Sequence, residues 1–308
     1  MNPSSDGLNE QQKGLLYAFG CYLIWGLFPL YWYPLSHGAI GAEQMLAQRV
    51  LWSALFSLAV LFVCRQSHLL AAAIRNPRLL LTFTGSALAI SINWLVFLWA
   101  ITHNHVLDAS LGYFISPLFS MLLGRMFFNE RFNRVQLAAI VLALTGVLWL
   151  ALPAGQVPWV ALLLTVSFGI YGLLRKIAPL AALPGMVLET LLMLPFAAAY
   201  LLWTAHKGDL VFGALPPLPL AILIGSGAAT TIPLMLFAAA AKRITMSHLG
   251  IIQYFSPTCQ FIIGLTVFGE AFDLSRFIGY VWVWAGVAVY LLGIWLQHRA
   301  AAPENPCI

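Results

Sequence analysis

Charged residues are scarce in this chain, and their scarcity identifies the solvent in which it folds. Asp, Glu, Lys and Arg make up only 8% of the 308 residues, whereas a soluble domain carries about 25%. Apolar residues make up 61%, and the mean hydropathy is +0.89. A soluble protein of this size is therefore excluded, and the sequence predicts a protein folded in lipid.

The usual motifs of enzymes and metal sites are also missing. The four cysteines lie far apart without CxxC spacing, so no disulfide or metal site is expected. No Walker loop, GxSxG or catalytic carboxylate pair occurs, which predicts neither an enzyme nor a cofactor. His103 and His105 have no third ligand nearby and are more typical of a solvated loop. The basic residues stand singly or in small groups between apolar runs, so they indicate topology and not a nucleic-acid partner.

One stretch of the sequence occurs twice. SPLFSMLLGRMFFNERF at 116–132 returns 140 residues later as SPTCQFIIGLTVFGEAF at 256–272, with six identities and no gap. Identity at a fixed offset indicates an internal repeat. The chain is therefore interpreted as two copies of one module of about 140 residues.

Ten apolar stretches are long enough to cross a bilayer as helices, at about 20 residues each. They lie at 14–34, 43–64, 79–102, 108–128, 136–152, 158–174, 184–203, 218–241, 248–268 and 276–296. This division predicts two five-helix repeats, 14–152 and 158–296, with tails at 1–13 and 297–308. Because five is odd, the two repeats are inverted in the membrane. Twelve of the fifteen Lys and Arg residues fall on the side of both termini, which predicts cytoplasmic termini.

Five stretches carry a resemblance to a known family. They are WGLFPLYW at 25–32, AQRVLWS at 47–53, NWLVFLWA at 93–100, NHVLDASLGYFISPL at 104–118 and GIIQYFSPTCQFIIGLTVFGE at 250–270. In combination they resemble the RarD-type permeases of the EamA family, in the drug/metabolite transporter superfamily. The resemblance implies a ten-helix inner-membrane permease in a group named for an association with chloramphenicol sensitivity, and it names no cargo.

Two prolines lie at matching places inside the fourth and ninth predicted helices. Pro117 and Pro257 each remove a backbone donor and free the carbonyl four residues earlier, at Tyr113 and Gln253. In lipid, a free carbonyl must be met by protein or by cavity water, so paired breaks in inverted repeats favour a solute site at the midplane. An ordinary packing kink is the alternative.

Aromatic and amide side chains from both repeats are expected around these breaks. Groups of this kind suit a neutral or amphipathic organic solute, which needs stacking area and a few hydrogen bonds. For most of the tryptophans, an interfacial belt or lipid packing is the alternative. The predicted cavity residues are Trp25, Arg49, Asn93, Trp94, Tyr113, Pro117, Tyr171, Gln253, Tyr254 and Pro257.

For each of two charged residues inside predicted spans, the sequence allows two roles. Arg49 lies about 9 Å into the second helix from its outer end, where it either snorkels outward or faces the cavity. Glu189 lies at a similar depth from the inner end of the seventh helix. Glu189 either binds a proton or the solute during transport, or it is stabilised by the dipole at the start of its helix. The dipole explanation is the one expected for Glu43.

Other residues are assigned structural roles. Glu130 and Glu270 stand at helix C-termini, where the dipole disfavours a carboxylate, and each is expected to cap the N–H groups of the following helix. Asp108 is expected to be the N-cap of the fourth helix. Small residues such as Gly146 and Gly286 favour close contacts of the fifth and tenth helices, as a scaffold or as a homodimer interface.

Together these features predict a secondary transporter for a small organic metabolite or drug-like solute, working by alternating access in the inner membrane. Export is the direction expected by analogy with the superfamily. An uptake permease is the alternative of the same class, and a membrane sensor or a lipid-acting enzyme is the alternative outside it. An enzyme would gather its polar groups in one half, whereas here they are spread over both.

Overall fold

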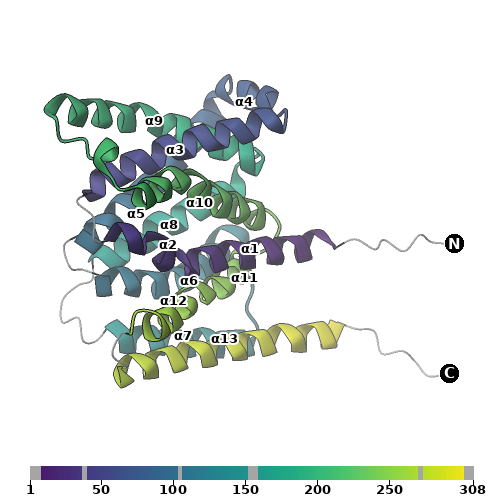
Figure 1. Ribbon diagram of the computed structural model, residues 1–308. Coiled ribbons are helices and arrows are strands. Elements are labelled where there is room, and N and C mark those ends of the chain that lie inside the picture. Colours follow the sequence, from purple (N-terminus) through teal and green to yellow (C-terminus); the bar gives the residue numbers. More distant parts are fainter. Residues whose placement is uncertain (1–7, 37–39, 103–105, 152–158, 270–272, 302–308) are drawn as a thin grey trace.

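The computed structural model describes residues 8–36, 40–102, 106–151, 159–269 and 273–301. Within these ranges the chain forms α-helices and one short 3-10 helix, and no strand. Figure 1 shows a bundle of long helices in which the start of α1 and the end of α13 lie at the same end. The predicted all-α class is confirmed.

Most helices follow the predicted spans closely, but the first predicted span, 14–34, is interrupted by a turn at Leu27, and two connections contain short additional helices. In the first half they are α1 (Glu10–Gly26), α2 (Phe28–Ser36), α3 (Ala42–Val63), α4 (Ser67–Ile74), α5 (Pro77–Thr102), α6 (Val106–Phe128) and α7 (Arg134–Ala151). In the second half they are α8 (Trp159–Ile177), α9 (Ala182–Lys207), η2 (Phe212–Ala214), α10 (Pro217–Ala241), α11 (Met246–Gln253), α12 (Phe255–Thr266) and α13 (Leu274–Ala301). Nine spans in the described residues are long and apolar enough to cross a membrane, with α1 and most of α2 forming one of them.

The predicted ninth span, 248–268, is not a single helix. α11 ends at Gln253 and α12 begins at Phe255, with Tyr254 between them. Pro257 has no N–H to donate to the carbonyl of Gln253, and the N–H of Tyr254 bonds to the carbonyl of Ile251 at 3.3 Å. The described part of the chain therefore contains the expected break in the second repeat.

The matching break in the first repeat is absent. α6 runs through Pro117 without interruption, so the prediction of two equivalent breaks is wrong for this helix. α11 crosses α6 closely here, since a Cβ added to Gly250 would lie 2.6 Å from the carbonyl oxygen of Pro117. The two related prolines thus sit in helices of different shape.

α7 and α13 pack against each other along the edge of the bundle (Figure 1). A Cβ added to Gly146 would lie 2.7 Å from the carbonyl oxygen of Gly279, and one added to Gly286 would lie 2.8 Å from that of Ala139. The small residues on these helices are therefore used for a contact within the chain. A homodimer through the same helices stays a prediction.

The bundle is apolar on its outside and carries polar groups inside. Val63 is 83% exposed, Phe196 79% and Leu81 75%, and such surfaces suit lipid better than water. Arg49 is only 8% exposed and Arg175 only 1%. This inverted distribution is what a membrane protein with an internal polar site requires.

Glu130 reaches back over the end of α6 and caps a helix of the other repeat. α6 is closed by Asn129 with a φ of 53°, in the left-handed conformation common at helix ends. The carboxylate of Glu130 then accepts hydrogen bonds from the backbone N–H groups of Met246, at 2.8 Å, and Ser247, at 3.0 Å. These are orphan donors at the start of α11.

The expectation that Glu130 would cap the next helix is therefore wrong about the partner. The next helix, α7, has a capping box of its own, in which Asn133 accepts from the N–H of Gln136 at 2.7 Å and donates its N–H to the Gln136 side chain at 2.9 Å. Glu270 lies outside the described residues. α6 begins at Val106, so Asp108 lies inside the first turn and is not the N-cap.

Candidate functional site

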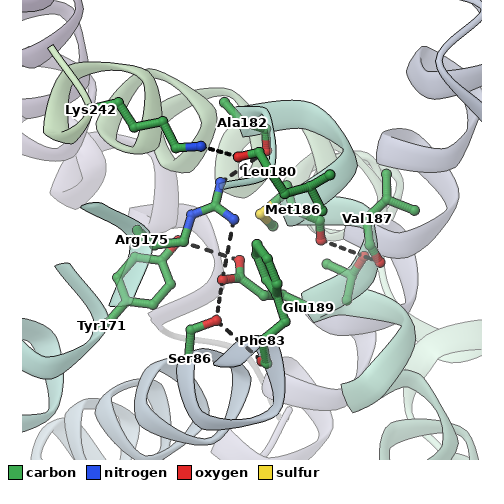
Figure 2. A network of polar contacts seen from close by, with 11 residues as sticks. Phe83, Ser86, Tyr171, Arg175, Leu180, Ala182, Met186, Val187, Glu189 and Lys242 are labelled. Atoms are coloured by element: carbon green, nitrogen blue, oxygen red, sulfur yellow. Dashed lines mark hydrogen bonds and ion pairs between the residues drawn. The ribbon is translucent and has the colours of Figure 1, made fainter. Parts of the chain in front are cut away.

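The most deeply buried charges belong to a polar network between α5, α8 and α9 (Figure 2). α8 ends and α9 begins within five residues, and this hairpin brings Arg175 opposite Glu189. Arg175 Nη1 lies 3.5 Å from Glu189 Oε1, and both side chains are 1% exposed. Ser86 donates to the same oxygen at 2.6 Å, and the Tyr171 hydroxyl lies 3.5 Å from Oε2.

The packing around Arg175 is tight enough to fix its position. Arg175 Nη2 donates to the carbonyl of Ala182 at 3.0 Å, and the guanidinium lies 5.4 Å from the centre of the Phe83 ring. A Cβ added to Gly185 would lie 2.2 Å from Nη1, so the glycine makes room for the guanidinium. Lys242 donates to the carbonyl of Leu180 beside it (Figure 2). The network ties three helices together at one end of the bundle.

Sequence reasoning missed Arg175, which it counted among the cytoplasmic charges that set the topology. The signal that points to it is Glu189, because a carboxylate inside a span needs a partner. The structure places Glu189 in a buried ion pair beyond the first turn of α9, so a dipole effect alone does not explain it. Glu43, in contrast, is exposed in the first turn of α3.

Arg49 forms a second buried site, between α2, α3, α5 and α10. Its Nε donates to Thr230 Oγ1 at 2.6 Å. The guanidinium carbon lies 4.2 Å from the centre of the Trp94 ring and 5.8 Å from that of Trp32. The side chain points into the bundle, so the alternative of outward snorkelling is wrong.

A cluster of aromatic rings joins the two repeats beside these charges. Trp25 lies 5.5 Å from Phe168 and 6.0 Å from Phe237, measured between ring centres. Tyr171 stacks on Phe237 at 5.7 Å and also contacts Glu189. Trp25, Trp94 and Tyr171 belong to the same core cluster, so the structure brings these three predicted residues together.

The remaining predicted residues are placed differently. Asn93 donates to the carbonyl of Leu164 at 2.9 Å and to Ser167 at 3.1 Å, so its amide is bound to α8. Tyr254 is 2% exposed and packs with α7 and α13 in another core cluster. The Oε1 atom of Gln253 is buried without a hydrogen-bond partner. Tyr254 is thus separated from the group around Trp25 that was expected to share its cavity.

Two expectations fall on undescribed parts of the chain. His103 and His105 lie outside the described residues, as does Glu270. Within the described ranges, no group of three His, Cys, Asp or Glu side chains is arranged to hold a metal ion.

Comparison with known proteins places this geometry in a family. The EamA-like transporter family profile matches residues 12–152. Protein RarD of Escherichia coli (strain K12) is 38% identical, over 95% of this chain and 98% of its own. The chain belongs to the EamA-like transporter family. The uncharacterized transporter YojE of Bacillus subtilis (strain 168) is 41% identical, over 91% of this chain and 94% of its own.

Membership of the EamA-like family confirms the resemblance seen in the motifs. A more distant relative, the chloramphenicol-sensitive protein RarD of Pseudomonas aeruginosa, is 31% identical over 91% of this chain and 93% of its own. One solved crystal structure shares the fold with a TM-score of 0.69 at 18% identity, covering 94% of this chain and 99% of that one. The protein is therefore a multi-pass membrane protein of a transporter family.

Proposed function

We propose that the protein is a secondary transporter that moves a small organic solute across the inner membrane by alternating access. The observation that carries the proposal is the buried pair of polar sites, Arg49 with Thr230 and Arg175 with Glu189, inside a bundle whose outer surface is apolar. Charges within a membrane span are costly and mark solute or ion paths. Export is the direction we propose, by analogy with the superfamily.

The two halves that alternate are, in this proposal, the inverted repeats 14–152 and 158–296. α11 and α12 together supply the remaining span, since the 21 residues from Met246 to Thr266 are long enough to cross a bilayer, with the break at Tyr254. Support also comes from Asn129 and Gly269, 140 residues apart, which close α6 and follow α12 with φ angles of 53° and 65°. The chain thus takes a left-handed conformation at the same offset in both repeats, directly after α6 and three residues after α12.

Both termini are proposed to be cytoplasmic. Basic residues of the second half lie beside the start of α1. Arg243 pairs with Glu10 at 2.8 Å, and Lys176 donates to the carbonyl of Ala241 at 2.8 Å. An accumulation of cations on one side favours the cytoplasm. Tags fused before Lys13 and after Gln297 are expected inside, and a periplasmic position of either tag would contradict the arrangement.

The solute path is proposed to run between the repeats, past Arg49 and the aromatic rings around Trp25. Uptake and efflux of a metabolite panel, compared between cells that lack and cells that overproduce the protein, test the proposal. A single cysteine at position 113, in a background without native cysteines, is expected to react with a water-soluble thiol reagent. A cysteine at Val283, which is 1% exposed on α13, is the matched control. Labelling of Val283→Cys without labelling at 113 would place the path elsewhere.

A further inference from the structure

Arg49 is a buried cation that no acid described in the structure neutralises. It stands seven residues after the start of α3, about 10 Å along the helix, and is 8% exposed. The acids whose side chains are described are bound elsewhere or exposed, and none lies within 4 Å of Arg49: Glu10, Glu43, Glu130, Glu189, Asp209 and Asp273.

The contacts of Arg49 leave one edge of its guanidinium unused. Among the described hydrogen bonds, only Nε donates, to Thr230, although a guanidinium has five N–H donors. Trp94 covers one face of the group at 4.2 Å, which gives a favourable cation–π contact but satisfies no N–H. The pair of Arg175 and Glu189 shows the contrast, since that cation has its carboxylate in the chain.

An edge of parallel N–H donors matches the two oxygens of a carboxylate, which accept two hydrogen bonds in one plane. The rings of Trp94 and Trp32 lie 4.2 Å and 5.8 Å from the guanidinium carbon, and aromatic surface of this kind suits the flat apolar part of an organic molecule. Thr230 lies thirteen residues into the 25-residue helix α10, so the guanidinium reaches the middle of the bundle.

We propose that Arg49 binds the anionic group of the transported solute and that the solute is a small organic carboxylate. The proposal rests on the transport function proposed above and narrows the solute class expected from the sequence, which was neutral or amphipathic. The solute itself supplies the counter-ion that the described acids do not provide. Arg49 with its aromatic surroundings thereby selects for charge at one end of the solute and for a flat apolar body at the other.

The test compares untargeted metabolite profiles of medium and cytosol from cells with and without overproduced protein, using the full-length chain. The wild type is expected to redistribute carboxylate anions. Arg49→Gln is expected to lower that redistribution about tenfold or more, which is the effect of losing a charged hydrogen bond. Arg49→Lys keeps the charge but loses the planar fork, so its activity is expected to lie between the two.

Arg276→Gln is the matched control, because it removes the same charge from an exposed pair with Asp273, and it is expected to transport as the wild type does. Membrane abundance and thermal unfolding in detergent show whether each variant folds. Redistribution of mainly neutral or cationic solutes by the wild type would overturn the proposal even if no Arg49 variant folds. Equal export of anions by Arg49→Gln would overturn it as well. No redistribution of any solute would instead refute the transport function.

Discussion

Removing one member of the Arg175 and Glu189 pair should destabilise the protein at least as much as removing both. At 3.5 Å, the attraction between two unit charges is about 5 kcal/mol at an effective dielectric constant of about 20. Arg175→Met leaves Glu189 buried with only Ser86 and Tyr171 as partners. We expect a loss of about 3 to 5 kcal/mol in the free energy of unfolding, as is typical when a buried pair is broken.

The double variant Arg175→Met with Glu189→Gln removes both charges, so the desolvation cost of each disappears with their attraction. Its loss is expected to be no larger than that of Arg175→Met alone. Unfolding by SDS in mixed micelles, followed by circular dichroism, gives the free energies of unfolding of the wild type, of Arg175→Met, of Glu189→Gln and of the double variant. These four values form a double-mutant cycle. Arg276→Met, in an exposed pair, is the control and should cost less than about 1 kcal/mol. Additive losses in the cycle, or an Arg175→Met loss as small as that of the control, would refute the reasoning.

Three further outcomes are expected from the same unfolding measurement. Glu130→Gln should lower the free energy of unfolding by about 1 to 3 kcal/mol, because the amide has one acceptor oxygen where the carboxylate accepts two charged hydrogen bonds. Unchanged stability would show that other groups cap the start of α11. Gly286→Val should lower the free energy of unfolding by about 1 to 3 kcal/mol or more, because the added side chain overpacks against α7. Gly213→Val is the control and should lower it little, because nothing lies within 4 Å of the added Cβ. Equal losses for the two variants would contradict the close contact of α7 and α13. Burial and two neighbouring arginines lower the pKa of Lys242 to about 8, below the roughly 10.4 of an unfolded chain. Between these two pKa values the unfolded state binds more protons than the folded state. The free energy of unfolding of the wild type should therefore rise relative to that of Lys242→Met from about pH 8 to pH 10. A difference between the two proteins that stays flat or falls over this range would contradict the lowered pKa.

The helices could be predicted because they depend on local signals. Apolar runs of bilayer length give the spans, whereas the arrangement of these spans as two inverted repeats stays a prediction. Whether a proline breaks its helix is decided by packing. Pro117 lies in a continuous helix that Gly250 approaches closely, whereas Pro257 follows a break at Tyr254. The sequence alone does not distinguish these two surroundings.

The charged sites show the same limit. Arg49 was recognisable as unusual because it stands inside an apolar span, but its direction depends on Thr230 and Trp94, which are far away in the sequence. Arg175 was missed because a cation at a helix end also satisfies the positive-inside rule. Only the hairpin of α8 and α9 shows that it is buried against Glu189. Pattern reasoning therefore locates buried charges better than it pairs them.

The hydrogen bonds of Glu130 restrict how the two halves of the bundle can move. Glu130 follows α6 in the first half, and the N–H groups that it binds begin α11 in the second half. Pulling these two helix ends apart would leave a carboxylate and two backbone donors unpaired in a partly buried place, which is costly. Rotation about the contact preserves the bonds. Rocking of the halves would then have its pivot at this end of α6, and the largest displacements would occur at the opposite end of the bundle.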